Sequence, residues 1–246
     1  MKKLLVSNRK GGVGKTTITC HAAWHFAEKR RVLVVELDTQ RNGSATLEPH
    51  KIGVTTSQLL TGKVEIPGLG GPGIAVIEAD DELKSIEIGP QQIATLKSNL
   101  DAVADKFEVC IFDAAPSADT LNVGPMIFAS HVLAPIELTE YSLQGIESLL
   151  QSIIGMQKKF NPNLVFLGML PNKFVANSPR QKEALTELFA KVGNKFMFDA
   201  VLHMRQAYEQ AASTKEPAWK DTKTASRVAG KEIRTVMEKL EKRVFA

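Results

Sequence analysis

Several features that mark other protein classes are missing from this chain of 246 residues. It has only two cysteines, Cys20 and Cys110, in segments that we expect to be buried, so a disulfide framework is excluded. No Cys/His cluster has the spacing of a zinc site. No apolar run approaches the length of a membrane span, and the run after Lys2 and Lys3 is too short for a signal peptide. These absences predict a globular protein of a reducing, cytoplasmic compartment.

The most informative segment is the glycine-rich stretch RKGGVGKTT, residues 9–17. It follows an apolar run and precedes a helical pattern, and a glycine turn between strand and helix lets backbone N–H groups converge on phosphate oxygens. Lys15 can reach the β- and γ-phosphates, and the Thr16 hydroxyl can hold Mg²⁺. The nucleotide-binding residues that we expect here are Gly11, Gly12, Val13, Gly14, Lys15, Thr16 and Thr17.

Two residues of this stretch depart from the plain P-loop. Arg9 stands where that pattern has its first glycine, and Lys10 is an additional lysine before the glycines. A glycine turn with a purely architectural role is the alternative interpretation. Three glycines, two lysines and two threonines at this spacing favour phosphate binding.

Apolar runs alternate with helical patterns along the whole chain, which predicts an α/β fold with a mostly parallel, twisted sheet and helices on both faces. No internal repeat or low-complexity tail is visible, so we expect a single domain over residues 1–246. The expected strands are 4–8, 32–37, 74–78, 109–112, 131–136, 164–170 and 196–202. The expected helices are 16–29, 90–106, 119–129, 141–160, 178–192, 204–213 and 222–243.

Three polar side chains stand at the carboxyl ends of expected strands, where open parallel sheets bind their ligands. Asp38 can orient or activate the attacking water or bind Mg²⁺ through water, although a helix N-cap is the alternative role. Asp113 ends a run of apolar residues like a Walker B carboxylate, with a turn or cap aspartate as the alternative. Asn172 can pair with both edges of adenine, or it is simply a turn asparagine.

The order of these elements resembles the ParA/MinD group of ATPases, whose deviant P-loop has a signature lysine at the position of Lys10. The P-loop, Asp38, Asp113 and Asn172 occur in ParA order, and residues 201–212 look like a later strand-to-helix segment of that family. The resemblance covers essentially the whole chain and is to the short ParA type, without an N-terminal helix-turn-helix domain. Departures are Glu36, Arg41 and Ala115, where the family commonly has aspartate, glycine and proline.

The resemblance implies an ATPase that uses ATP and Mg²⁺ within a sandwich homodimer. Lys10 would cross to the ATP of the partner while Lys15 serves its own, and a side chain at Gly12 would obstruct pairing. Catalysis would rest on Lys10, Lys15 and Asp38, and the metal would lie near Thr16, Asp38 and Asp113. Because groups are needed in trans, we expect slow basal turnover that a partner stimulates.

The positive charge of the chain is concentrated near its C-terminus. Residues 201–246 contain ten Lys/Arg and six Asp/Glu, whereas residues 1–200 are neutral. The last helix combines an apolar stripe with basic residues on another face, which is either a solvated surface or a site for an anionic partner. ParA-like proteins bind non-specific DNA in this way. The expected DNA-binding residues, on helices at about 204–243, are Arg205, Lys223, Arg227, Lys231 and Arg234.

We therefore expect a DNA-partition switch that associates with the nucleoid and is released by a centromere-binding, ParB-like adaptor protein. Three alternatives remain open on the sequence. A MinD-like protein would bind membranes through its last helix, but the apolar stripe looks docked, so we expect no membrane contact. A metal-cluster member of the group would need exposed cysteines. A ParA-like ATPase that positions protein cargo would have nearly the same ATPase residues.

Overall fold

The computed structural model describes residues 1–116, 120–138, 142–221 and 223–246. Residues 119, 141 and 222, at which three of the expected helices begin, lie outside the described residues.

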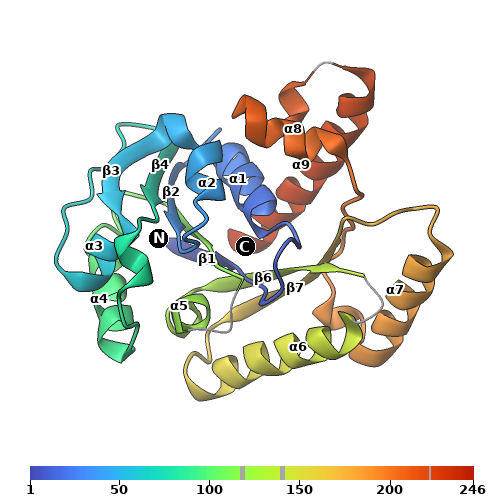
Figure 1. The fold of residues 1–246 in the computed structure, drawn as a ribbon, viewed down its shortest axis with the longest axis horizontal. Coiled ribbons are helices and arrows are strands. Elements are labelled where there is room, and N and C mark those ends of the chain that lie inside the picture. The colour runs from blue at the N-terminus through green and yellow to red at the C-terminus, as the bar shows by residue number, and fades with distance from the viewer. Residues whose placement is uncertain (117–119, 139–141, 222) are drawn as a thin grey trace.

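Seven parallel strands form one sheet at the centre of the molecule, with the order β3-β4-β2-β5-β1-β6-β7 (Figure 1). The strands are β1 (Lys2–Val6), β2 (Arg31–Glu36), β3 (Lys51–Thr55), β4 (Gly73–Glu78), β5 (Val109–Asp113), β6 (His131–Glu137) and β7 (Val165–Asn172). The expected α/β fold class is confirmed. The strand order changes direction around β1, and such a switch opens a crevice at the carboxyl ends of the strands.

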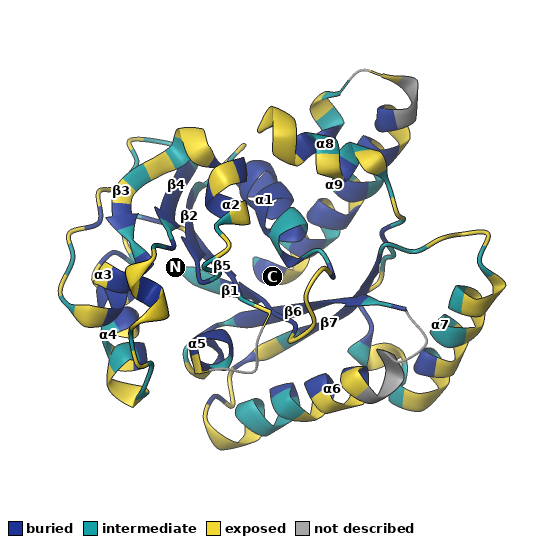
Figure 2. Ribbon diagram, in the orientation of Figure 1, coloured by how far each residue is buried: buried dark blue, intermediate teal, exposed yellow. Residues whose placement is uncertain are grey.

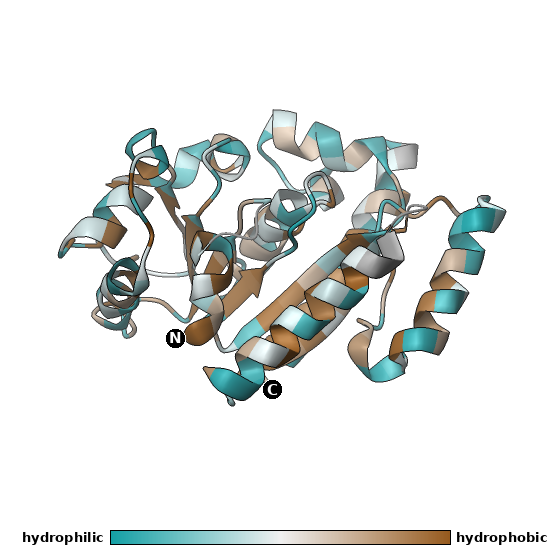
Figure 3. Ribbon diagram, turned by 60° about the horizontal axis from the view of Figure 1, so that its bottom comes forward, coloured by the Kyte–Doolittle hydropathy of each residue, from teal (hydrophilic) through white to brown (hydrophobic). Residues whose placement is uncertain are grey.

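Helices cover both faces of this sheet because alternate residues of each buried strand point to opposite sides. Leu4 and Val6 of β1 join one apolar cluster, whereas Leu5 joins the other. One cluster lies under α1 (Lys15–Phe26), α8 (Gln206–Thr214) and α9 (Thr224–Val244). The other contacts α3 (Thr56–Thr61), α4 (Pro90–Asp101), α5 (Thr120–Val123), α6 (Ser142–Lys159) and α7 (Pro179–Val192). The helices turn their exposed residues outward (Figure 2), and α6 and α7 are hydrophilic on one side and hydrophobic on the other (Figure 3).

One expected strand is absent and one observed strand was missed. Residues 196–202 are buried at Phe198 and Leu202, which explains their strand-like apolar pattern, but they are not a strand. A backbone hydrogen bond from Ala200 N to Phe198 O turns the segment, so its pairing with β7 is limited to isolated contacts. Strand β3 escaped notice because it is a short edge strand in which only Val54 is buried.

The apolar stripe of α9 is docked on the body of the protein. Ala229, Ile233, Val236, Leu240 and Val244 are all at most 2% exposed. Because these residues already form part of the core beside α1, the apolar stripe of α9 is not available to a bilayer, and the exposed apolar side chain on the described part of the helix is the single Val228. No helix of the described residues is long and apolar enough to cross a membrane.

Gly168 provides a test of how tightly β7 is packed. Its φ is +116°, and a Cβ there would lie 2.6 Å from the backbone nitrogen of Phe198. We expect Gly168→Ala to lower the free energy of unfolding by about 3 kcal/mol, because both the backbone conformation and the close approach require glycine. Urea denaturation measures this change. The matched control is Gly155→Ala in α6, where a Cβ meets nothing within 4 Å, so it should raise stability by roughly 0.5–1 kcal/mol. Equal effects of the two substitutions would contradict the packing at Gly168.

Candidate functional site

The glycine-rich loop connects the central strand β1 to the N-terminus of α1. Gly12 and Gly14 have φ values of +74° and +91°, a backbone conformation that only glycine adopts without strain. Gly14 is the N-cap of α1, so the first free N–H groups of that helix open toward the loop. A Cβ at Gly14 would lie 2.1 Å from Nδ2 of Asn172, so the end of β7 is pressed directly against the loop. The loop is therefore a rigid cradle of N–H groups.

A cavity of about 730 Å³ opens beside this cradle, at the carboxyl ends of the strands. Seven of the residues expected to bind the nucleotide or the metal line it: Gly12, Gly14, Lys15, Thr16, Thr17, Asp38 and Asn172. Of the other expected site residues, Lys10, Gly11, Val13 and Asp113 do not form part of its lining. The sequence thus identified most of the cavity wall on the side of the glycine-rich loop.

Lys15 lies at the base of the cavity and is only 6% exposed. Its Nζ donates a hydrogen bond to the backbone oxygen of Lys10 at 3.1 Å. Burial lowers the pKa of Lys15, while the nearby carboxylates of Asp113 and Asp38 oppose this change. The ammonium group is therefore held between the loop and two acidic side chains, in the place where a phosphate group would approach the helix N-terminus.

Asp113, at the end of β5, is completely buried under the start of α1. Thr19 donates a side-chain hydrogen bond to it, with a distance of 3.3 Å from Thr19 Oγ1 to Oδ1. Its other oxygen, Oδ2, has no hydrogen-bond partner among the described residues. Burial raises the pKa of Asp113 to about 7, and the neighbouring Glu36 contributes to the increase. A buried carboxyl oxygen without a partner is an available acceptor for a cation or for ordered water.

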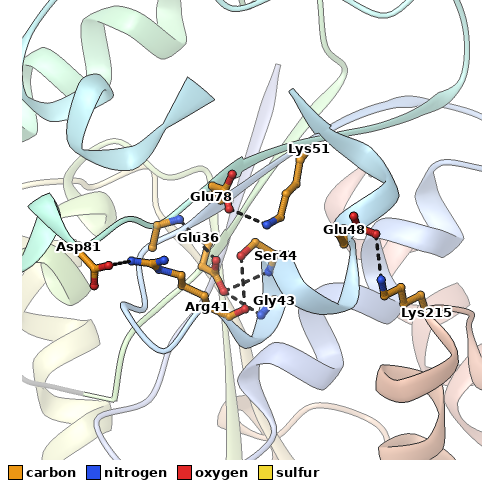
Figure 4. Close-up of polar contacts among 10 residues, drawn as sticks. Glu36, Arg41, Gly43, Ser44, Glu48, Lys51, Glu78, Asp81 and Lys215 are labelled. Carbon is orange, nitrogen blue, oxygen red and sulfur yellow. Dashed lines mark hydrogen bonds and ion pairs between the residues drawn. The ribbon is translucent and has the colours of Figure 1, made fainter. Parts of the chain in front are cut away.

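Glu36 is a second buried carboxylate that the sequence marked only as a departure from the family. It pairs with Asp113 across β2 and β5 and accepts hydrogen bonds from the N–H groups of Gly43 (2.7 Å) and Ser44 (3.2 Å) (Figure 4). These bonds fix the start of α2 (Asn42–Thr46) next to the cavity. Burial raises the pKa of Glu36, as it does for Asp113. The two carboxyl groups therefore form an acidic layer below the phosphate cradle.

Arg41 has a backbone conformation that favours glycine. Its φ is +58°, in the left-handed region that glycine favours. The side chain reaches Asp81, with 2.6 Å between its NH2 and Oδ2 (Figure 4). The chain therefore adopts the strained turn with arginine and adds an ion pair at the surface.

Asp38 and Asn172 both make hydrogen bonds to the backbone, but not in the alternative roles considered for them, because Arg41 is the N-cap of α2 and Asn172 is the last residue of β7. The Asp38 Oδ1 accepts a hydrogen bond from Gln40 N at 2.9 Å, the contact of a turn aspartate, while the residue also lines the cavity. The Asn172 Nδ2 donates to the backbone oxygen of Val13 at 2.8 Å. That donor therefore supports the loop, and the expected pairing of Asn172 with adenine stays a prediction.

Lys10 lies on the rim, outside the cavity lining. Its Nζ is 3.2 Å from Oε2 of Glu137 at the end of β6, and the lysine side chain is 46% exposed. Arg9, the neighbouring departure from the P-loop pattern, donates to the hydroxyls of Ser148 and Ser152 on α6. The two residues thus anchor the first half of the loop to β6 and α6.

The five basic residues expected to bind DNA do not form one uniform surface. Lys223, Arg227 and Lys231 are exposed, and neither Arg227 nor Lys231 makes an ion pair with another described residue. Arg234 is bound by both oxygens of Glu28, at 3.0 and 2.8 Å. Arg205 lines the cavity and pairs with Glu232 at 3.3 Å. The structure therefore leaves three of the five open to solvent on the N-terminal half of α9.

Several cavity residues were not anticipated from the sequence. His21 and Trp24 extend the lining along α1, and Tyr208 faces them from α8. His21 follows Thr17 by four residues and Trp24 follows His21 by three, which places them on one side of α1 and was the only available signal. His21 is 1% exposed; its Nδ1 donates to Thr17 O at 2.7 Å and its Nε2 accepts from Ala218 N at 3.2 Å. The neutral ring thus joins α1 to the segment that precedes α9.

Comparisons with known proteins agree with this geometry. A family model described as an AAA domain matches residues 1–166. Protein IncC of Escherichia coli is 36% identical over 246 residues, covering 97% of this chain and 68% of that protein. The chromosome partitioning protein ParA of Caulobacter vibrioides is 27% identical over 230 residues, covering 88% of this chain and 86% of that protein. A crystal structure of cobyrinic acid a,c-diamide synthase from Mycobacterium smegmatis, with an ATP analog and magnesium, has a TM-score of 0.76 at 24% identity and covers 98% of this chain and 95% of its own. That structural likeness shows the fold alone.

The buried histidine predicts a dependence of stability on pH. Burial lowers the pKa of His21 from 6.5 to about 4, so between these values the unfolded chain binds a proton that the folded chain excludes. The contribution of His21 to the free energy of unfolding should therefore fall by about 3 kcal/mol as the pH is lowered from 6.5 to 4. Asp113 acts in the opposite direction over this range, because its raised pKa makes the folded chain bind a proton that the unfolded chain does not, so the effect of His21 is read as the difference between the variant and the unchanged protein. His21→Gln, whose amide can make both hydrogen bonds but does not titrate, should lose most of this dependence. Denaturation at a series of pH values measures it, and an unchanged slope in the variant would show that another group is responsible.

Proposed function

Because the chain belongs to the AAA domain family and, within it, to the ParA-type partition ATPases, we propose that it is an ATP-dependent switch for partitioning plasmid or chromosomal DNA. In the proposed cycle, two copies pair around Mg-ATP, the dimer binds non-specific DNA of the nucleoid, and hydrolysis releases it. A centromere-binding, ParB-like adaptor protein stimulates the hydrolysis, which is slow without it. The observation that carries the proposal is the cavity in which the N–H cradle, Lys15 and Asp38 meet.

The residues of the site are suited to ATP and Mg²⁺. The left-handed backbone at Gly12 and Gly14 directs N–H groups toward the cavity, and Asn172 holds the loop in place. The described residues contain no group of three or more His, Cys, Asp or Glu side chains that could hold a metal by itself. A cation that also uses phosphate oxygens and water, as Mg²⁺ does, suits such a site.

Each residue then has a distinct proposed role. Lys15 and the loop N–H groups would bind the phosphates, and the Thr16 hydroxyl and Asp113, whose Oδ2 has no partner among the described residues, would hold Mg²⁺. Asp38 would orient the attacking water from the cavity wall. Mg²⁺, when bound, neutralises negative charge on the phosphates.

Lys10 is proposed to act across the dimer, which its position on the rim supports. It is half exposed and pairs with Glu137 of its own chain, and an exposed ion pair of this kind is worth only about 0–1 kcal/mol. The lysine can therefore leave Glu137 at little cost and reach the nucleotide of a second copy. Gly12 is exposed, and a Cβ built on it would meet no atom of its own chain within 4 Å. Gly12 is therefore proposed as part of the surface that contacts the second copy.

The N-terminal half of α9 is the proposed DNA surface, carried by Arg227 and Lys231, with Lys223 beside them. Both are exposed and make no ion pair with another described residue, so their charges are available to phosphates. A dimer presents two such surfaces, and each additional phosphate contact strengthens binding in a salt-dependent way. Arg234, already bound by Glu28, contributes less.

Replacement of Lys10 separates nucleotide binding from pairing. We expect Lys10→Ala to change the Kd of ATP less than about threefold, because exposed contacts contribute little, and to abolish ATP-dependent dimerisation. Sedimentation with a non-hydrolysable ATP analogue measures the dimer, and calorimetry measures the affinity. Lys15→Ala is the comparison, since it should lose nucleotide binding itself. A Lys10→Ala protein that dimerises normally would show that this lysine is not used in trans.

DNA co-sedimentation with ADP, ATP and a non-hydrolysable analogue tests the proposed function as a whole. Binding should require the triphosphate state, and the double variant Arg227→Gln, Lys231→Gln should reduce the slope of log affinity against log salt by about two per protomer. Lys242→Gln, which also removes one exposed charge of α9, is the control. DNA binding of equal strength with ADP, with ATP and with the analogue would contradict the proposal. Binding to liposomes instead of DNA in a parallel assay would contradict it as well.

A further inference from the structure

Arg205, which the sequence assigned to DNA, has a different environment from the exposed basic residues of α9. It precedes α8 as the N-cap residue and lines the cavity. Its NH2 is 3.3 Å from Oε2 of Glu232, and its buried Nε has no hydrogen-bond partner among the described residues. The Arg205 side chain is 36% exposed and gives one hydrogen bond to Glu232, so the remaining exposed N–H groups of its guanidinium fork are available to a ligand in the cavity.

Glu232 holds together the part of the cavity wall that contains Arg205. Its carboxylate accepts hydrogen bonds from His203 N (2.7 Å), His203 Nδ1 (2.8 Å) and Tyr208 Oη (2.9 Å), and its side chain is only 17% exposed. These donors lower the pKa of Glu232 despite its burial, so it stays ionised beside Arg205. Because the charge of Arg205 is already balanced by an almost buried carboxylate, it is poorly suited to DNA phosphates.

The neighbours of Arg205 locate it relative to the phosphate cradle. Phe174 and His203 form a backbone bridge, with hydrogen bonds from Phe174 N to Leu202 O and from Met204 N to Phe174 O, both at 3.0 Å. Phe174 is two residues beyond Asn172, which contacts the loop. The wall that carries Arg205 therefore continues from the phosphate cradle into the part of the cavity that the nucleoside would occupy.

We propose that Arg205 binds the nucleoside part of the nucleotide and that Glu232 is its positioning residue. The N–H groups that Glu232 leaves unused donate to acceptors of the base or the ribose. This assignment rests on the proposed binding of ATP, but it concerns a part of the cavity that the glycine-rich loop does not form.

Calorimetry with three probes tests the assignment: ATP, ADP and inorganic tripolyphosphate, each with Mg²⁺. Arg205→Gln should raise the Kd of ATP and ADP roughly tenfold or more, because it removes hydrogen bonds from a charged donor, and leave the Kd of tripolyphosphate unchanged. Lys15→Ala should raise the Kd of all three probes. An equal loss for tripolyphosphate and ATP would overturn the assignment to the nucleoside.

A double-mutant cycle tests the role of Glu232. Glu232→Gln, which keeps the shape of the side chain, should weaken the binding of ATP more than the binding of tripolyphosphate. The double variant with Arg205→Gln should lose little more affinity for ATP than either single variant. Additive losses, or an equal loss of both probes, would mean that Glu232 acts only on the fold. Thermal melting confirms that each variant is folded.

The same Arg205→Gln protein separates this assignment from DNA binding. At saturating nucleotide, its salt slope for DNA should match that of the unchanged protein. A normal affinity for ATP, together with a slope of log DNA affinity against log salt that is reduced by about one per protomer, would show that Arg205 binds DNA and not the nucleoside. If the unchanged protein binds tripolyphosphate but neither nucleotide, the proposed function itself fails, which is distinct from every result above.

Discussion

The left-handed backbone at Gly12 and Gly14 is the constraint on which the rest of the site depends. It turns the chain from the central strand β1 into α1 within a few residues, so the free N–H groups of the helix face the ends of the strands. Asn172 closes this arrangement from β7, because its amide occupies the space that a side chain at Gly14 would need. The cavity, Lys15 and Thr16 all take their positions from this one turn.

Below the turn lie two buried carboxyl groups, Asp113 and Glu36. Burial disfavours their negative charge, and a nearby cation would stabilise it. Asp113 and Glu36 are both fully buried, and burial raises the pKa of each. Glu36 is satisfied by the N–H groups of α2, whereas one oxygen of Asp113 has no partner among the described residues. This unsatisfied acceptor, which lies next to Gly43 at the start of α2, is the strongest physical reason, apart from the loop, to expect a divalent ion near the phosphates.

The sequence predicted the fold class and the side of the cavity that the loop forms, because glycine spacing and strand-end acids have local signatures. It did not predict the opposite wall. The roles of Glu232 and Tyr208 depend on α9 lying against α8, a contact between segments that no local pattern reveals. Arg205 was assigned with the basic residues of α9 because charge can be counted along a sequence, whereas an ion pair with Glu232 can be seen only in three dimensions. The edge strand β3 was missed for a related reason. Few of its residues are buried, so the sequence has no apolar pattern there, and only its pairing with β4 identifies it as a strand.

The proposed nucleotide and DNA surfaces both involve the packed helices α8 and α9, with the cavity beside α8 and the exposed Arg227 and Lys231 on α9. The most direct test of this account is the change in backbone amide NMR signals when Mg-ATP is added to the protein. The account predicts that the largest shifts fall on residues 11–17, with smaller ones at Asp38, Asn172 and residues 203–208. Shifts confined to another part of the molecule, with residues 11–17 unaffected, would contradict it.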